Sequence, residues 1–589
     1  MFDLVIRGGT IVDGAGAAPF TGDIAITDGA IVEIGVLTGA AAKNVLDADG
    51  ALVTPGWVDA HTHYDGQVSW DDTLESSIAN GTTSVVMGNC GVGFAPVAVD
   101  ATDTLIDFME GVEDIPGTAL YEGVPWGQWE SFPSYLDYLD TRRFSVDVAA
   151  QVPHAPLRLY VMGERALHDG DSTPDDVTKM AQIVTESIKA GAAGFSTSRI
   201  TFHRTASGQT LPGTYAPEQE LLALAKAMVD GGGGVFQAVP ASSAGNSMYS
   251  PKPEQASMLE EVAMFGRLSR ATGVPFNFIL AQIRDNPNGW REVLAASAQE
   301  NSTGAKLFPM IGSRGISGIT TLRTYHAFSR RPTFVALQQK LSHSELVAAM
   351  RGPEVKAAIL AEADAPTDKP GSMDNVQPAV FAAALERTFP FYAGFNYEPP
   401  VSDSFLARAQ SVGRDPLEFM YDFLLEEDGN ALGVRFSGNY WDGSLDACRE
   451  MMLDANTVWG LSDAGAHVKY VCDMSTPTFN LVHWVRDRSH DRLPVEFIVQ
   501  KMTSRNAHLY GLNDRGTLQV GKRADVNVID LDNLAVHKPV LCFDLPAGGE
   551  RFHQAATGYL ATVVNGELVR QHDTDTGARP GRLARTVHN

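Results

Sequence analysis

Two histidines separated by a single residue, His61 and His63, end a short apolar run near the start of the chain. Side chains in a β-strand alternate between its faces, so histidines at i and i+2 project to the same side and can bind one cation through their imidazole nitrogens. A second run, rich in β-branched residues, ends at Cys90, whose thiolate could bridge two metal ions. These residue types and this spacing predict a metal-dependent hydrolase.

Eight apolar, strand-like runs are spread along the chain and alternate with helical patterns. They cover residues 56–60, 81–90, 145–152, 193–198, 235–239, 275–281, 305–310 and 457–463. Residues 221–229 and 258–268 have the spacing of helices between them. The alternation predicts an α/β fold, a parallel (β/α)8 TIM barrel, in which catalytic groups lie at the carboxyl ends of the strands. The two histidines and the cysteine come at such ends.

The two ends of the chain and one internal segment differ from this pattern. Residues 1–55 and 512–575 contain short alternating strands separated by glycine turns, and we expect them to form one small β-sandwich domain. The barrel domain is predicted to span 56–511. The segment 311–456, just before the last strand, is much longer than an ordinary connection. We expect it to overhang the catalytic mouth as a lid or substrate-selecting insertion, or else to act as a structural buttress.

The charge and cysteine content narrow the class of protein. The chain has 45 basic and 71 acidic side chains and a formal net charge of −26, which disfavours nucleic acid or an anionic membrane as a partner. Its 4 cysteines lack the spacing of a metal finger or a disulfide framework, as is typical of a reducing cytoplasm. The first residues lack a basic segment and a long apolar run. We therefore expect a cytoplasmic protein with a small-molecule partner, and the sequence leaves a homo-oligomer open.

Four motifs follow one another in order along the chain. They are Gly-Trp-Val-Asp-Ala-His-Thr-His-Tyr-Asp at 56–65, Val-Met-Gly-Asn-Cys-Gly-Val-Gly-Phe-Ala-Pro at 86–96, Gly-Ala-Ala-Gly-Phe-Ser-Thr-Ser at 191–198 and Leu-Ser-Asp-Ala-Gly-Ala-His at 461–467. Together they resemble the N-acyl-D-amino-acid deacylase (D-aminoacylase) group of the amidohydrolase superfamily. The likeness covers most of the chain. It implies a barrel with a β-sandwich, a zinc site at the barrel mouth, and hydrolysis of an amide by metal-activated water.

The resemblance assigns roles to four residues. His61 and His63 match the ligands after the first strand, Cys90 matches a bridging cysteine, and Asp463 matches an aspartate after the last strand. Asp463 would be both a metal ligand and the general base and acid, which takes a proton from the attacking water and returns it to the leaving nitrogen. A strand-end aspartate that caps the next backbone turn is the structural alternative.

This chain departs from the family pattern at two further positions. The family normally has histidines after the fifth and sixth strands, whereas this chain has Gln237 and Gln282. A neutral amide oxygen is a poor ligand for Zn²⁺ beside imidazole or thiolate. The fourth-strand segment also contains no lysine that could form a carboxylated bridge. We therefore expect one zinc ion rather than two, held by the four residues named above, with iron or manganese as alternatives.

Further polar side chains follow the predicted strands and are candidates for contacts with the substrate. His467 could donate to the substrate carbonyl, or pack in its loop beside Tyr470. Arg199 suits a substrate carboxylate through bidentate hydrogen bonds, unless it forms an ion pair within its own loop. The remaining candidates are His154, His203, Gln237, Gln282 and Arg314.

The predicted function is metal-dependent hydrolysis of a carbon–nitrogen bond in an N-acyl amino acid or a related small amide. Two alternatives stay open. The first is hydrolysis of a cyclic amide or imide, which the same metal chemistry could perform. The second is a metal-poor, non-catalytic binding protein that retains the fold. The joint presence of His61, His63, Cys90 and Asp463 favours an enzyme, because a scaffold needs none of them.

Overall fold

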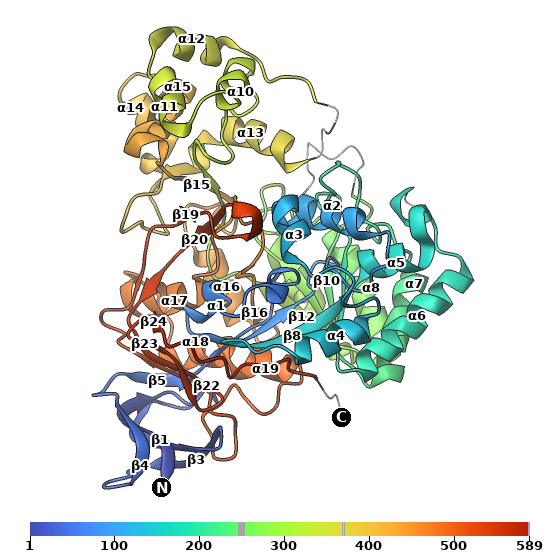
Figure 1. Ribbon diagram of the computed structural model, residues 1–589, viewed down its shortest axis with the longest axis vertical. Coiled ribbons are helices and arrows are strands. Elements are labelled where there is room, and N and C mark those ends of the chain that lie inside the picture. The colour runs from blue at the N-terminus through green and yellow to red at the C-terminus, as the bar shows by residue number, and fades with distance from the viewer. Residues whose placement is uncertain (169, 246–253, 368, 370–371, 587–589) are drawn as a thin grey trace.

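A computed structural model describes residues 1–589 except 169, 246–253, 368, 370–371 and 587–589 (Figure 1). Its centre is a sheet of eight parallel strands in which each strand pairs with the next one along the chain. The strands are β6 (Trp57–Asp59), β7 (Thr82–Met87), β8 (Asp147–Pro153), β9 (Gly194–Ser198), β10 (Val235–Val239), β11 (Phe276–Leu280), β12 (Leu307–Ile311) and β16 (Val458–Trp459). All eight predicted strands are present, and the nearly closed barrel is confirmed.

Helices follow most of the barrel strands and pack around the sheet (Figure 1). Those nearest the barrel are α1 (Glu75–Ile78), α2 (Thr102–Glu113), α3 (Gly117–Gly123), α4 (Phe132–Asp140), α5 (His154–Met162), α6 (Pro174–Lys189), α7 (Glu218–Gly231), α8 (Met258–Thr272), α9 (Gly289–Ser302), α16 (Asp446–Leu453), α18 (Val495–Met502) and α19 (Ser504–Leu509). The two predicted helices lie within α7 and α8. At the start of α8, Ser257 and Glu260 form a capping box, which satisfies two backbone N–H groups.

Alternation along the strands decides which side chains point into the barrel. Phe236 of β10 stacks on Phe276 of β11 with ring centroids 4.5 Å apart, and Phe265 of α8 stacks on Phe276 at 5.5 Å. These phenylalanines therefore face the surrounding helices. Since neighbouring residues of a strand point to opposite sides, Gln237 faces the barrel interior.

The last barrel strand is shorter than the sequence predicts. Residues 457–463 form an apolar run, but β16 contains only Val458–Trp459. Leu461 and Asp463 have φ values of 61° and 48°, in the left-handed region, which cannot continue an extended strand. Asp463 is therefore carried by a loop beyond the strand rather than by the strand itself.

The segment before β16 has its own sheet and helices. Its strands are β13 (Ile316–Thr320), β14 (Thr388–Pro390) and β15 (Gly433–Gly438), and its helices are α10 (Pro332–Gln338), α11 (His343–Met350), α12 (Pro353–Ala361), α13 (Met373–Ala383), α14 (Phe405–Ser411) and α15 (Pro416–Leu424). The helices pack around a separate hydrophobic core. The backbone N–H of Ile319 donates to the carbonyl of Tyr470, and the Tyr325 hydroxyl donates to Asp114. The insertion thus contacts loops at the carboxyl end of the barrel, while its role as a lid stays a prediction.

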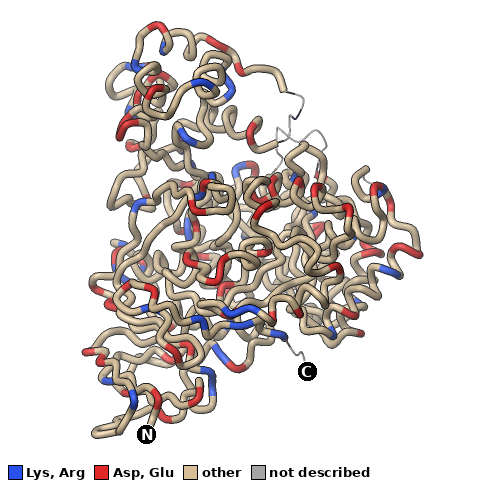
Figure 2. The backbone as a smooth tube through the Cα atoms, viewed as in Figure 1, with Lys and Arg blue, Asp and Glu red and all other residues tan. Residues whose placement is uncertain are grey.

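Both ends of the chain contribute strands to one nine-stranded sheet. The strands are β1 (Phe2–Ile11), β2 (Phe20–Thr27), β3 (Ala30–Gly35), β4 (Ala42–Asp47), β5 (Leu52–Pro55), β17 (Val526–Ile529), β22 (Tyr559–Val564), β23 (Glu567–Gln571) and β24 (Thr574–Asp575). Strands β5 and β17 join the two ends as an antiparallel pair. The sandwich arrangement and the predicted boundaries 1–55 and 512–575 stay predictions. Acidic residues occur on the barrel, the insertion and this sheet, interspersed with basic ones (Figure 2). In the described part of the chain, every helix is too short or too polar to cross a lipid bilayer.

Candidate metal centre and active site

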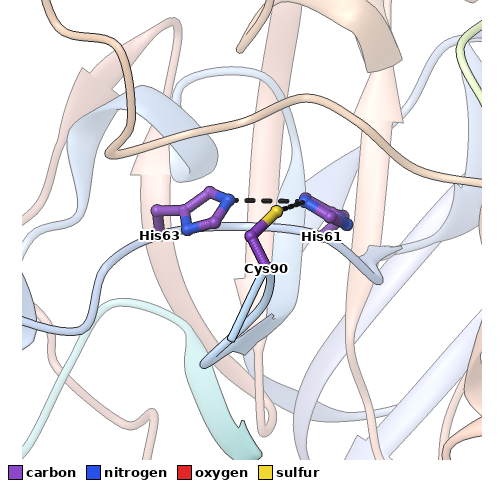
Figure 3. Close-up of side chains that lie close together, drawn as sticks. All are labelled: His61, His63 and Cys90. Atoms are coloured by element: carbon purple, nitrogen blue, oxygen red, sulfur yellow. Dashed lines mark hydrogen bonds between the residues drawn. The ribbon is translucent and has the colours of Figure 1, made fainter. Parts of the chain in front are cut away.

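Three of the four residues expected to bind metal, His61, His63 and Cys90, lie together at the carboxyl end of the barrel. The Nε2 atoms of His61 and His63 are 3.3 Å apart, and the Sγ atom of Cys90 is 3.4 Å from His61 Nε2 (Figure 3). One ligand atom from each of the three residues lies within 4.8 Å of the others. Asp463 Oδ1 is 3.5 Å from His61 Nε2. Three potential donors therefore lie within reach of one cation, and Asp463 lies beside one of them, His61.

These separations fit a tetrahedral zinc ion. Two nitrogen ligands at about 2.05 Å from zinc in tetrahedral geometry are about 3.3 Å apart, and a nitrogen and a sulfur ligand are about 3.6 Å apart. Both values agree with the distances around His61 Nε2. Two imidazole nitrogens facing each other at 3.3 Å share at most one proton. A cation between them would satisfy both lone pairs, so the residues present fit the metal that the sequence predicts.

The backbone around Cys90 aims the thiol at the histidines. Cys90 has a φ of 55°, an unusual conformation for a residue with a side chain. The flanking Gly88 and Gly91 have φ values of 79° and 73°, and a Cβ atom on Gly88 would lie 2.3 Å from the carbonyl oxygen of Gln151. The backbone N–H of Cys90 donates to Gln237 Oε1 at 3.0 Å. This tight turn holds the sulfur over the barrel mouth.

Burial keeps the two histidines neutral. Both side chains are 1% exposed. Burial and neighbouring imidazoles lower the pKa of His61 to about 3 and hold the pKa of His63 well below its usual range. Neutral imidazole is the form that binds metal. Burial also raises the pKa of the Cys90 thiol, with further contributions from Glu113 and Asp463. A cation at this point would reverse that shift, because it stabilises the thiolate.

Asp463 and His467 lie on the loop after β16 and remain partly open. Each side chain is 21% exposed, in contrast to the buried histidines. Burial, followed by the charges of Asp473 and Asp59, raises the pKa of Asp463 to about 8. Burial lowers the pKa of His467 to about 4. Asp463 thus holds a proton near neutral pH in the metal-free fold, and a cation beside it would lower its pKa and free the carboxylate to accept a proton. His467 is a neutral hydrogen-bonding group.

Two of the expected substrate-contact residues also lie beside the cluster. Gln237 is fully buried and its Nε2 atom has no hydrogen-bond partner, although its Oε1 atom accepts from Cys90. His203 Nδ1 lies 2.9 Å from Ser198 Oγ. Burial lowers the pKa of His203 to about 3. A positive charge on His203 would lower the pKa of both His61 and His63. Gln237 therefore contacts the turn of Cys90 directly, whereas His203 lies near enough for its charge to affect the histidines.

Comparison with known proteins agrees with this geometry. The model of the amidohydrolase family matches residues 44–570, which is most of the chain. The chain belongs to the amidohydrolase family. It is accordingly a metal-dependent hydrolase of carbon–nitrogen bonds other than peptide bonds.

Relatives of this amidohydrolase include several deacylases. The chain is 25% identical over 596 residues to a D-aminoacylase of Alcaligenes xylosoxydans, covering 100% of this chain and 98% of that protein. A solved N-acyl-D-glutamate deacylase from Bordetella bronchiseptica, complexed with zinc and a phosphonate inhibitor, has a TM-score of 0.64, 22% identity and coverage of 99% and 100%. A D-aminoacylase structure concerned with one-metal activation and second-metal attenuation of a binuclear centre has a TM-score of 0.64, 22% identity and coverage of 99% of each chain.

The sequence did not single out one residue of this amidohydrolase site, Glu113. Its carboxylate is 1% exposed at the end of α2, and neither oxygen has a hydrogen-bond partner. Glu113 Oε1 lies 3.3 Å from His63 Nδ1, and Oε2 lies 3.5 Å from His467 Nε2. Burial and the charge of Asp463 raise the pKa of Glu113 well above its usual range. A carboxylate behind a metal-binding histidine fixes its orientation and raises its basicity.

The other residues expected to contact substrate bond to side chains of the protein away from the cluster. Arg199 Nε donates to Glu261 at 2.7 Å, and Arg314 Nη2 donates to Asp473 at 2.5 Å, both buried. Arg199 thus forms an ion pair, as its structural alternative predicted, but with α8 rather than within its own loop. Arg314 is also held in an ion pair, so the free binding capacity of both arginines is small.

His154 and Gln282 are held in the same way. His154 Nε2 lies 2.8 Å from Glu220 and its Nδ1 atom lies 2.8 Å from Thr197 Oγ1. Gln282 donates to Asp442 at 2.6 Å and accepts from the Trp441 backbone at 3.0 Å. Gln282 therefore joins the barrel to the insertion. Contact of either residue with substrate stays a prediction.

Proposed function

We propose that this amidohydrolase removes the acyl group from an N-acyl amino acid, with N-acyl-D-amino acids as the first candidates. The cluster of His61, His63 and Cys90, with Asp463 beside His61, carries this proposal, because it supplies a metal site and an adjacent proton carrier. The D-aminoacylase relative aligns over the whole chain, and this supports the substrate class.

The proposed metal is a single zinc ion held by the same four residues. When bound, zinc polarises a carbonyl oxygen and lowers the pKa of water. The resemblance assigns Gln237 and Gln282 to the positions where the family has imidazoles, and both Gln282 groups are engaged with the insertion. Fewer strong ligands remain for a second ion. The related D-aminoacylase with one-metal activation supports function with one ion.

Asp463 is the proposed general base and acid. Its carboxylate lies beside His61 Nε2 and is partly open to the mouth, so it can reach both a water molecule and a bound amide. It takes one proton from the water as the water oxygen bonds to the carbonyl carbon. It returns that proton to the nitrogen as the carbon–nitrogen bond breaks. The products are a carboxylic acid and a free amine.

His467 and Glu113 orient groups around this reaction. His467 is neutral at physiological pH and partly exposed, so its ring N–H can donate to the substrate carbonyl oxygen. Glu113 lies between His467 and His63, where it holds both rings in one orientation. We propose that this carboxylate couples the metal ligand to the substrate contact.

Metal analysis of the full-length protein, purified without chelator, tests the metal centre. We expect about one equivalent of zinc in the wild type and its loss in His61→Ala. His326→Ala is the matched control, because His326 is equally buried but lies in the core of the insertion. Loss of zinc in the control as well would contradict the assignment. A wild type without metal or activity would favour the non-catalytic alternative.

A substrate screen with the zinc-loaded enzyme tests the reaction. Paired N-acyl-D- and N-acyl-L-amino acids are compared with cyclic amides and imides by release of free amine or acid. We expect turnover of N-acyl-D-amino acids. Turnover of the cyclic compounds alone would overturn the proposed substrate class and leave the metal centre intact.

A further inference from the structure

The two strands that carry most of the metal ligands are neighbours in the barrel but are not paired. His61 and His63 follow β6, and Asp463 follows β16. Among the residues that the structure describes, no backbone ladder joins β6 to β16, since the barrel sheet begins and ends with these strands. The separation of His61 from Asp463 is therefore set by contacts other than strand pairing. We call this gap the seam.

Backbone contacts close the seam only beyond the ends of the strands. Thr62 and Ala464 form an isolated parallel bridge, and the N–H of His63 donates to the carbonyl of Ala464 at 2.8 Å. At the strands themselves the bridge is a side chain. Asn506 Nδ2 donates to the carbonyl of Val58 in β6 at 2.8 Å and to that of Trp459 in β16 at 2.7 Å. One amide group thus replaces the missing ladder.

A second side-chain pair crosses the seam directly under the ligands. Asp59 Oδ1 accepts from the backbone N–H of His61 at 3.2 Å, and Asp59 Oδ2 accepts from the hydroxyl of Ser462. The Ser462 oxygen in turn accepts from the N–H of Ala464 at 3.3 Å. Asp59 is thus tied to the first metal ligand on one side of the seam and to the residue before Asp463 on the other.

A small cavity with a mixed apolar and polar lining lies behind this pair. Its volume is about 30 Å³, and Asp59, Ser462 and Asn506 are among its lining residues. Four buried polar atoms of the lining residues lack a protein hydrogen-bond partner: Ser313 Oγ, Trp459 Nε1, Asn480 Oδ1 and Asn506 Oδ1. A cavity needs about 10–15 Å³ and two or more polar partners to hold a water molecule. This cavity meets both conditions for about two water molecules.

We propose that Asp59, Ser462 and Asn506, together with water in the cavity, form a clamp that sets the spacing of His61 and Asp463 and thereby the affinity for metal. The proposal rests on the metal site of the proposed function and extends it to three positioning residues and a water site. The clamp acts through the ligands, because none of the three side chains is itself among the four proposed metal ligands.

The zinc dissociation constant of the full-length protein, measured by competition with a chelator, tests the clamp. We expect Ser462→Ala and Asn506→Ala to weaken zinc binding about 10–100-fold, as is usual when a partner of a metal ligand is removed. The Co²⁺-substituted variants should also show altered ligand-field absorption. Ser462→Thr, which keeps the hydroxyl, should restore both properties. Ser297→Ala is the matched control, because Ser297 is a buried serine whose hydroxyl donates to Val293 within α9.

The outcomes separate the clamp from the proposed function. If the wild type binds zinc and both alanine variants bind it equally well with unchanged Co²⁺ spectra, the clamp is overturned and the metal site stands. If the wild type binds no zinc, the proposed function fails first. A crystal structure of the wild type supplies a measurement that needs no variant. Ordered water bridging Asn506 or Asn480 is expected, and an empty cavity would overturn the hydrated clamp.

Discussion

Two of the clusters of buried ionisable side chains on this barrel differ in how their polar atoms are satisfied. Around His154, both ring nitrogens have partners, and both oxygens of Glu220 are bonded, to Arg158 and Ser172 among others. Around His63 and Glu113, the carboxylate oxygens and the histidine Nδ1 have no hydrogen bond. Buried polar groups are normally paired. The carboxylate of the first cluster is therefore fully paired within the protein, whereas the second leaves buried polar atoms unpaired beside the proposed metal position.

The largest expected effect is a loss of kcat when the proton carrier of the metal cluster, Asp463, is replaced. Asp463→Asn keeps the shape of the side chain but removes its basicity, so kcat should fall about 10²–10⁴-fold. Steady-state kinetics of the zinc-loaded variant measure this effect. The same substitution at Asp442, which accepts from Gln282 at the insertion, is the control. Equal losses in the two variants would contradict the role of Asp463.

The matching change in the cluster around His154 should lower the stability of the fold and leave the catalytic reaction unchanged. Glu220→Gln leaves Arg158 buried without its carboxylate partner, and the free energy of unfolding should fall by about 3–5 kcal/mol. Denaturant unfolding measures the change, and the zinc content should remain that of the wild type. Loss of zinc from Glu220→Gln without a change in stability would contradict the structural role of this cluster.

A smaller effect is expected at Glu113. Glu113→Gln removes the carboxylate behind His63 and should weaken zinc binding about 10–100-fold, which chelator competition can measure. Glu110→Gln lies on the same helix, where Glu110 accepts from the backbone of Gly117, and should leave zinc affinity unchanged. Similar affinities of the two variants would show that Glu113 does not act on His63.

The pH dependence of stability sharpens the contrast further. The pKa of Asp463 is raised from 3.8 to about 8 in the metal-free fold, so the folded state binds a proton that the unfolded state releases. The contribution of Asp463 to the free energy of unfolding therefore falls as pH rises from about 4 to about 8. Metal-free Asp463→Asn should gain stability relative to the metal-free wild type over that range. Unfolding curves at several pH values measure the difference, and a constant difference would contradict the raised pKa.

The smallest effect is expected from restoring the missing imidazoles. The double variant Gln237→His, Gln282→His should bind a second metal ion, and only weakly, because residue 282 must first release Asp442 and the Trp441 backbone. Metal titration with calorimetric detection would show a second, weaker step. The single variant Gln237→His should lack it. A second tight site in the wild type would show that the glutamines do not limit the number of ions.

The sequence predicts the barrel and the core of the site because both depend on local patterns. The apolar runs locate all eight strands, and the spacing of His61 and His63 predicts the pair that the structure brings together with Cys90. Glu113 was missed because nothing in the spacing of α2 separates it from Glu110. Its burial results from packing at the barrel mouth.

The partners of the arginines were likewise not predictable. Glu261 and Asp473 lie far along the chain from Arg199 and Arg314, so only the fold brings these pairs together. The positive φ of Asp463, which shortens the last strand, is also a property of the loop rather than of the apolar pattern.

Three of the side chains at this mouth stand on backbone that disfavours them. Cys90, Asp463 and His467 have φ values of 55°, 48° and 46°, and such conformations cost about 1–3 kcal/mol each for residues other than glycine. Glycine would relieve that strain at every one of these positions. A laboratory selection for heat resistance alone would therefore be expected to erase these side chains, so selection on this enzyme should always include turnover.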